Sequence, residues 1–219
     1  MPTVKPDIVP ADIVRYAAAH GTQPDASQRQ LIAETDALGM ARQLQIGGEQ
    51  GVLMEMLARL CGARSAIEIG TFTGYSALCL ARGMGPLGRL ICCDVSVEWT
   101  DVARRNWAAA GVADRIDLRI GPALDTIRSI PAEEQFDLVF IDADKTSYVA
   151  YYDELVPRVR AGGLLMIDNT LWKGQVLDES DQSADTVAIR ALNDHVAADA
   201  RVTVVIVTIA DGLTLALKN

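Results

Sequence analysis

The chain has 219 residues, a length that suits one large α/β domain better than two small ones. Half of its residues are hydrophobic, so a sizeable core can form without disulfides or a structural metal. Its formal net charge of −9 argues against nucleic acid or an anionic membrane as the binding partner.

Targeting and redox features of the sequence predict a cytoplasmic protein. Residues 1–10 lack a basic segment followed by an apolar one, so we expect no signal peptide there. No apolar run approaches the roughly 20 residues that a membrane-spanning helix needs. None of the four cysteines has the spacing of a zinc site, and we expect all of them to be reduced residues of the core.

The first 60 residues are predicted to form a helical N-terminal extension. Apolar residues recur at helical spacing in three stretches of this region. In the third stretch, residues 50–60, the expected buried stripe is Leu53, Met54, Leu57 and Leu60. Because these helices precede the first strand, they could cover the sheet, a ligand or a second subunit.

Residues 61–219 show alternating strand and helix patterns. Five strands separated by segments long enough for crossover helices are expected at 65–69, 89–93, 116–120, 136–141 and 163–167. Two further strands, at 202–209 and 213–217, are joined through Asp211-Gly212, a hairpin turn signal. The sequence therefore predicts one α/β domain, residues 1–219, with a Rossmann-like, doubly wound, mostly parallel seven-stranded sheet that ends in an antiparallel hairpin.

Oxygen-bearing side chains follow two of the predicted strands. Asp142 comes directly after the fourth strand, and Asp168-Asn169 follows the fifth. Ligands of an open α/β sheet bind beyond the carboxyl ends of its strands, so these donors should meet at one edge. Carboxylate and amide oxygens suit Mg²⁺ or a similar hard cation. Each aspartate could instead cap the next helix, but the paired arrangement beside Lys145 favours a metal site.

A loop with two glycines follows the first strand. Gly70 and Gly74 are spaced as Gly-x-x-x-Gly before a helix whose N-terminus offers unpaired N–H groups to an anion. Dinucleotide enzymes carry G-x-G-x-x-G instead. Asp94 ends the second strand, where a carboxylate can accept both hydroxyls of a ribose. The pattern predicts a nucleoside cofactor, and spacing alone leaves NAD and S-adenosylmethionine open.

Five segments of the chain together resemble the motifs of one known family. They are residues 68–76, 121–124, 140–145, 168–172 and 211–217. The chain resembles the cation-dependent O-methyltransferases, which include the caffeoyl-CoA and bacterial catechol-type enzymes. The resemblance extends over nearly all of the chain from about residue 35. Two positions depart from the family pattern, the Gly47-Gly48 turn and Lys173, where the plant enzymes place Asn.

The resemblance implies roles for particular residues. Contacts with S-adenosylmethionine are implied for Ile46, Glu68, Gly70, Ser76, Asp94, Ala123 and Asp144. Ligation of a divalent cation (Mg²⁺, or Mn²⁺ or Ca²⁺) is implied for Asp142, Asp168 and Asn169, and a catalytic or substrate-orienting role for Lys145. Asp142, Trp172 and Lys173 are expected to face the substrate. The family also implies a homodimer.

The predicted function is methyl transfer from S-adenosylmethionine to a hydroxyl of a catechol-like or other vicinal-oxygen small molecule chelated to the cation. Alternatives are an NAD-dependent oxidoreductase, a metallohydrolase, and a nucleoside-binding protein of the same fold with a non-catalytic partner role. The stretch from Tyr148 to Tyr152 is interpreted as a helix face rather than a proton relay, and His20 and His195 as surface residues.

Overall fold

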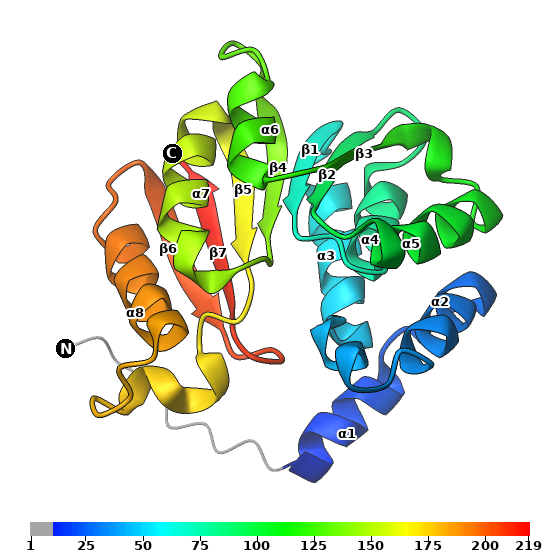
Figure 1. Ribbon diagram of the computed structural model, residues 1–219, viewed down its shortest axis with the longest axis horizontal. Coiled ribbons are helices and arrows are strands. Elements are labelled where there is room, and N and C mark those ends of the chain that lie inside the picture. Colours follow the sequence, from blue (N-terminus) through cyan, green and yellow to red (C-terminus); the bar gives the residue numbers. More distant parts are fainter. Residues whose placement is uncertain (1–10) are drawn as a thin grey trace.

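The computed structural model describes residues 11–219, and its seven strands form one sheet in the order β3-β2-β1-β4-β5-β7-β6 (Figure 1). The strands are β1 (Ser65–Ile69), β2 (Arg89–Asp94), β3 (Ile116–Ile120), β4 (Phe136–Ile141), β5 (Val159–Ile167), β6 (Val202–Val207) and β7 (Leu213–Lys218). β7 pairs antiparallel with both β5 and β6, so six strands run parallel and one runs against them. The predicted fold class is confirmed.

Helices cover both faces of the sheet. They are α1 (Ala11–His20), α2 (Ala26–Asp36), α3 (Gly48–Leu60), α4 (Tyr75–Met84), α5 (Val97–Ala109), α6 (Ala123–Ser129), α7 (Tyr148–Leu155) and α8 (Ala184–Ala197). Side chains alternate across a strand, so in β4 Leu138 and Phe140 join the core beneath α3, α4 and α5, whereas Val139 and Ile141 join the core beneath α6, α7 and α8. Both faces of the central strands are therefore buried, as their continuous apolar runs predict.

The predicted stripe on α3 is partly wrong. Met54 is buried, but Leu60 is 78% exposed, and the side of α3 that meets α4 carries small residues instead. A Cβ on Gly51 would lie 2.8 Å from the ring of Tyr75, and one on Gly83 of α4 would lie 2.3 Å from a backbone oxygen of α3. The two helices approach closely because glycine has no side chain at these positions. The spacing of large apolar residues therefore did not predict which side of α3 packs against α4.

Two strand boundaries differ from the prediction by more than one residue. β5 begins at Val159 rather than at residue 163, and its pairing with β4 shifts register next to the pair Phe136↔Val159. The strand contains Gly162 and Gly163, which weaken a strand pattern in the sequence but are typical of a bulge. β6 ends at Val207 rather than at residue 209, because the chain already turns toward β7.

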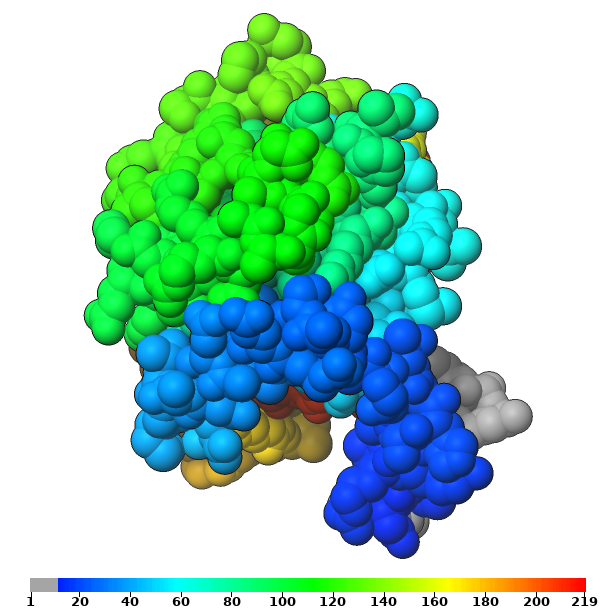
Figure 2. Space-filling view, turned by 90° about the vertical axis from the view of Figure 1, so that its right-hand side faces the viewer, coloured from blue at the N-terminus to red at the C-terminus, as the bar shows by residue number. Residues whose placement is uncertain are grey.

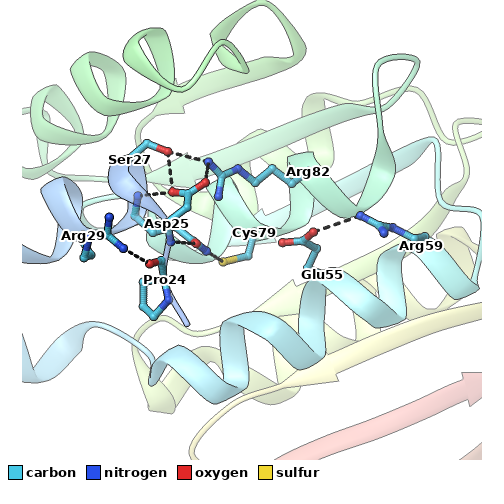
Figure 3. A network of polar contacts seen from close by, with 9 residues as sticks. Pro24, Asp25, Ser27, Arg29, Glu55, Arg59, Cys79 and Arg82 are labelled. Carbon is cyan, nitrogen blue, oxygen red and sulfur yellow. Dashed lines mark hydrogen bonds and ion pairs between the residues drawn. The ribbon is translucent and has the colours of Figure 1, made fainter. Parts of the chain in front are cut away.

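α2 is tied to the core by polar contacts at its beginning (Figure 3). Asp25 caps the helix and forms an ion pair with Arg82 of α4 at 2.9 Å, while Ser27 accepts a hydrogen bond from the same guanidinium at 2.6 Å. Gln28 donates to the Cys79 sulfur. α1, in contrast, protrudes from the rest of the molecule, as both overall views show (Figures 1 and 2).

The prediction of a cytoplasmic protein rested on the cysteines, on the lack of a membrane-spanning helix and on residues 1–10. All four cysteines are free; three are buried as predicted, but Cys61 is only half-buried because it follows the end of α3. Within residues 11–219 no helix is long and apolar enough to cross a membrane. Residues 1–10, for which the sequence predicts no signal peptide, lie outside the described residues.

Candidate active site

The carboxyl ends of four strands are joined by backbone hydrogen bonds into one continuous edge. The N–H of Gly70 after β1 donates to Cys93 of β2 at 2.9 Å, and the N–H of Asp142 after β4 donates to Ile69 of β1 at 2.8 Å. The N–H of Asp168 after β5 donates to the last residue of β4 at 3.0 Å. These bonds bring residues far apart in sequence to one side of the sheet, as the parallel topology requires.

A cavity of about 960 Å³ opens at this edge. All but one of the predicted site residues line it: Ile46, Gly70, Ser76, Asp94, Ala123, Asp142, Asp144, Lys145, Asp168, Asn169, Trp172 and Lys173. Glu68 is the exception, since it is fully buried and does not line the cavity. We refer to the part formed after β1, β2 and β3 as the cofactor half, and to the part formed after β4 and β5 as the acceptor half.

Asp94 organises the cofactor half through the backbone of the glycine loop. Its Oδ2 accepts hydrogen bonds from the N–H groups of Thr71 and Phe72 at 2.9 and 2.7 Å, and its Oδ1 accepts one from Ser96 at 2.8 Å. Oδ2 thus uses both of its lone pairs, whereas Oδ1 retains one for another donor. The predicted ribose acceptor therefore also fixes the shape of the loop, a role that the sequence pattern did not reveal.

Gly70 is required by packing against the protein. It adopts φ = +88°, and a Cβ built there would lie 1.9 Å from the carbonyl oxygen of Asp142. A side chain at this position would therefore push the end of β1 away from the end of β4. The tight contact that requires glycine here is between the two halves of the site, and Gly70 also lines the cavity, where its predicted contact with the cofactor stays a prediction.

Unpartnered polar atoms lie around the cofactor half. Both carboxylate oxygens of Glu68 and the hydroxyl of Thr71 are buried without a hydrogen bond of normal geometry. Burial raises the pKa of Glu68 to about 7. Buried polar groups in native structures nearly always have partners, and a polar ligand with amino and hydroxyl groups, such as S-adenosylmethionine, fits Thr71 on the cavity wall.

Lys145 lies at the centre of the acceptor half and is buried. Its Nζ donates to Asp142 Oδ1 at 3.0 Å and to the hydroxyl of Tyr148 at 2.6 Å. The same ammonium lies 5.8 Å from the centre of the Trp172 ring. These contacts hold the Lys145 ammonium in one position inside the cavity.

Asp168 and Asp142 form a pair of carboxylates at the cavity wall. Burial first, and the charge of Asp142 second, raise the pKa of Asp168 to about 7. The amide of Gln50, from α3, lies beside Asp168 and opposes part of this rise, although neither of its amide atoms makes a hydrogen bond of normal geometry. A divalent cation would offset the repulsion between the two carboxylates, so the residues present fit such an ion.

The candidate donor set consists of two carboxylates and the amide of Asn169, which also lines the cavity. No group of three or more His, Cys, Asp and Glu side chains in residues 11–219 is arranged to hold a metal ion. Oxygen donors of this kind, without histidine or cysteine, are typical of Mg²⁺ and similar hard cations.

The loop after β5 has a strained backbone that distant segments hold in place. Asn169, Trp172 and Lys173 all have left-handed φ values, of 57°, 47° and 53°. Such conformations persist only where the surroundings enforce them. The N–H groups of Thr170 and Leu171 donate to the turn between β6 and β7, each at 3.0 Å, and further bonds come from that turn and from α8.

The sequence interpretation missed three residues of the site. Tyr148 and Tyr151 were assigned to a helix face, yet Tyr148 accepts from Lys145 and the Tyr151 hydroxyl donates to Asp144 Oδ1 at 2.6 Å. Tyr148 follows Lys145 by three residues and Tyr151 by six, a spacing that could have indicated one face of a helical turn. Gln50 lies on α3, far from any motif, and only the tertiary structure places it at the cavity.

The fold, the geometry of the site and the comparisons with known proteins all indicate the same class of enzyme. A family model described as O-methyltransferase matches residues 20–219. The chain is 41% identical over 210 residues to the probable caffeoyl-CoA O-methyltransferase 2 of Dictyostelium discoideum, covering 94% of this chain and 91% of the relative. It is 39% identical over 181 residues to the catechol O-methyltransferase of Mycobacterium tuberculosis, covering 83% and 81%.

A solved structure gives the same result. The O-methyltransferase TomG from Streptomyces achromogenes, determined in complex with SAM, superposes with a TM-score of 0.87 at 30% identity, covering 95% of this chain and 96% of TomG. The chain therefore belongs to the O-methyltransferase family. The NAD-dependent oxidoreductase and the metallohydrolase considered from the sequence are set aside.

Proposed function

We propose that the chain transfers the methyl group of S-adenosylmethionine to one hydroxyl of a catechol-like or other vicinal-oxygen small molecule in the presence of a divalent cation. The observation that carries this proposal is the pairing of Asp142 and Asp168 at the cavity wall, with Lys145 bonded to one of them. Asp142, Asp168 and Asn169 would hold the cation. Methyl donors bound in relatives such as TomG support the choice of cofactor.

The acceptor must lose a proton before it can attack a methyl group. A phenol with a pKa near 10 is ionised in only about one molecule in a thousand at pH 7, a deficit of roughly 4 kcal/mol. A bound divalent cation supplies positive charge that lowers the pKa of a chelated hydroxyl. Asp142 and Tyr148 hold the Nζ of Lys145 inside the cavity. As an ammonium, Lys145 would donate a hydrogen bond to the acceptor oxygen, and only in its neutral amine form would it take the hydroxyl proton.

Alignment is the second contribution of the chain. Asp94 and the glycine loop would fix the ribose, Ser76 and Asp144 would contact the rest of the donor, and Trp172 would cover the acceptor ring. Glu68, which lies behind this wall, would act only through the residues in front of it. Holding two reactants in line converts a bimolecular step into an effectively unimolecular one. Ile46 and Ala123, both buried apolar residues of the cavity wall, would contact the adenosine.

Product analysis by mass spectrometry tests this proposal. The chain would be incubated with S-adenosylmethionine and a panel of catechols and matched mono-phenols, with Mg²⁺ and then with EDTA. We expect methylated catechols, little product from mono-phenols, and loss of activity in EDTA that Mg²⁺ or Mn²⁺ restores. Full activity after removal of metal, or equal rates on both acceptor classes, would contradict chelation of two adjacent oxygens.

We also propose a homodimer in the cytoplasm. α1 protrudes and exposes Ile13, Val14 and Tyr16 at 54%, 49% and 63%, which a second copy of the chain would cover. Free cysteines are typical of a reducing compartment. Light scattering at micromolar concentration tests the assembly, since a mass near the 23.5 kDa of one chain would contradict it.

A further inference from the structure

The rim of the acceptor half is rich in carboxylates. The carboxylates that line the whole cavity are Asp94, Asp142, Asp144, Asp168, Asp185 and Asp211, and the basic side chains are Lys145 and Lys173. The proposed function assigns the first four aspartates to the cofactor and the cation, and Lys145 to the reacting hydroxyl. Asp185 and Asp211 then remain, with Lys173, to meet the part of an acceptor that lies away from the reacting ring.

The rim segment, defined as residues 173–185, adds to the excess of carboxylates over basic side chains. It leaves the cavity at Lys173 and returns to it at Asp185, the second residue of α8. Between these ends it carries Asp178, Glu179 and Asp181 and no basic residue. Hydrogen bonds from Ser180 lower the pKa of Asp178, and those from Ser183 and Thr186 lower the pKa of Asp181, so both are ionised at neutral pH.

Arg190, an arginine that hydrogen-bonds to the rim segment, is already engaged in holding it. Arg190 of α8 donates to the carbonyl oxygens of Val176 at 3.0 Å, Gln175 at 2.9 Å and Asp181 at 2.9 Å, and also to that of Asp178. Its guanidinium is therefore occupied by backbone acceptors, and binding a phosphate would require these bonds to break. The same bonds fix the rim segment, whose two ends, Lys173 and Asp185, line the cavity.

On the opposite side of the mouth the charge is no more favourable to anions. The 3₁₀ helix η1 (Gly39–Leu44) contributes Gln43 and Leu44 to the cavity wall. The neighbouring Arg42 lies 3.7 Å from Asp36, which offsets its charge. Within residues 11–219, neither of these two segments thus presents a cluster of free cations.

We propose that the acceptor is an uncharged or positively charged catechol, and that the acidic rim discriminates against polyanionic acceptors such as coenzyme A thioesters. This inference rests on the proposed function and narrows its substrate class. A coenzyme A tail carries several negative charges on its phosphates and would meet Asp185 and Asp211 on the cavity wall, with the acidic residues of the rim segment next to them. Like charges that approach within a Debye length of about 8 Å at physiological salt repel, and the repulsion weakens as salt rises.

The test compares acceptors that share one catechol ring and differ in the charge of the tail. 4-Methylcatechol is neutral, dopamine is cationic, 3,4-dihydroxyphenylacetate is anionic and caffeoyl-CoA is polyanionic. The kcat/KM of each would be measured with S-adenosylmethionine and Mg²⁺ at low and high sodium chloride. We expect the order cation, neutral, anion, polyanion, with caffeoyl-CoA at least about tenfold below 4-methylcatechol and the gap smaller at high salt.

A charge-reversal variant separates the rim from other causes of selectivity. In the double variant Glu179→Lys with Asp185→Lys, the ratio of kcat/KM for caffeoyl-CoA to that for 4-methylcatechol should rise about tenfold. The matched control is Glu133→Lys with Glu134→Lys, two exposed residues before β4, at the opposite edge of the sheet, where the same change in charge should leave the ratio unaltered.

The outcomes of these experiments distinguish a failure of the charge selection from a failure of the proposed methyl transfer. If caffeoyl-CoA is methylated as well as 4-methylcatechol, or if the rim variant and the control alter the ratio equally, the charge selection is wrong while the methyl transfer stands. Absence of turnover with every acceptor would overturn the proposed function and, with it, this inference.

Discussion

The two halves of the cavity are built in different ways. In the cofactor half the carboxylate of Asp94 accepts three backbone hydrogen bonds, two from the glycine loop after the neighbouring strand β1 and one from Ser96 close to it in sequence. In the acceptor half Asp142 and Asp168 oppose each other, and the loop that follows is held in left-handed conformations. The glycine loop of the cofactor half is thus held by hydrogen bonds to Asp94, whereas the acceptor half retains electrostatic repulsion that a positive charge would relieve.

This contrast has a functional meaning within the proposed mechanism. A cofactor with many hydrogen-bonding groups needs a preformed surface, which short-range backbone bonds provide. A site for a cation and an acidic hydroxyl needs concentrated negative charge, which is unfavourable until the cation binds. The predictions below test whether the two halves behave as separate units.

The largest expected effect is loss of turnover in Asp168→Ala. We expect kcat to fall on the order of 10³-fold or more, because several kcal/mol of charge stabilisation would be lost with the cation. The affinity for S-adenosylmethionine, measured by calorimetry, should change less than about threefold, equivalent to roughly 0.65 kcal/mol. Equal loss of turnover and of cofactor affinity would show that the halves are not separable.

The pH dependence of stability is the second test. Between the ordinary pKa near 3.8 and about 7, folded Asp168 keeps a proton that the unfolded chain has released. The contribution to stability is therefore fully present below the lower value and is lost as pH rises through the higher one. Without metal, we expect this group to lower the free energy of unfolding by roughly 3 kcal/mol between pH 4.5 and 7.5.

Chemical denaturation of the EDTA-treated chain at both pH values measures this loss. Asp168→Asn should remove the part of the stability loss that Asp168 causes. Excess Mg²⁺ should reverse the stability loss in the wild-type chain. Glu68, whose pKa burial also raises to about 7, titrates in the same direction, so Glu68→Gln separates its contribution. An identical pH dependence in Asp168→Asn and the wild-type chain would contradict the assignment.

Gly70→Ala tests the contact between the halves. The new methyl group would meet the Asp142 carbonyl oxygen, and we expect a loss of about 3 kcal/mol in the free energy of unfolding together with weaker cofactor binding. Gly111→Ala is the matched control, since Gly111 also has a positive φ, of 68°, but has nothing within 4 Å of a Cβ. Its loss should be only about 1 kcal/mol, from backbone strain alone. Similar losses in both variants would mean that the close approach at Gly70 does not matter.

The smallest expected effect concerns one hydroxyl. Tyr151→Phe removes the hydrogen bond to Asp144 and should raise the dissociation constant for S-adenosylmethionine about three- to tenfold, or roughly 0.5–1.5 kcal/mol. Tyr152 lies on the same helix and donates a similar bond, at 2.8 Å, to Asp199 outside the cavity. Tyr152→Phe should lower stability without changing cofactor affinity, and a change in both variants would argue against a specific role for Tyr151.

Local patterns in the sequence were sufficient for the strands and for the residues that directly follow them. An apolar run that ends in Asp142 or Asp168 signals a buried strand and its functional end in the same short segment. In a parallel sheet those ends necessarily share one edge, so the candidate donors could be placed together before the fold was known. The hairpin turn at Asp211-Gly212 was likewise predicted from two adjacent residues.

Only the tertiary structure decided which distant residues complete the site. Gln50 reaches Asp168 because the small residues Gly51 and Gly83 let α3 lie close against α4, and no periodicity of large apolar residues reports such a contact. Arg190 organises the rim through backbone carbonyls, which every residue has and no sequence motif marks. Side-chain patterns encode the elements, whereas contacts to the backbone and close packing of small residues become visible only when the chain is folded.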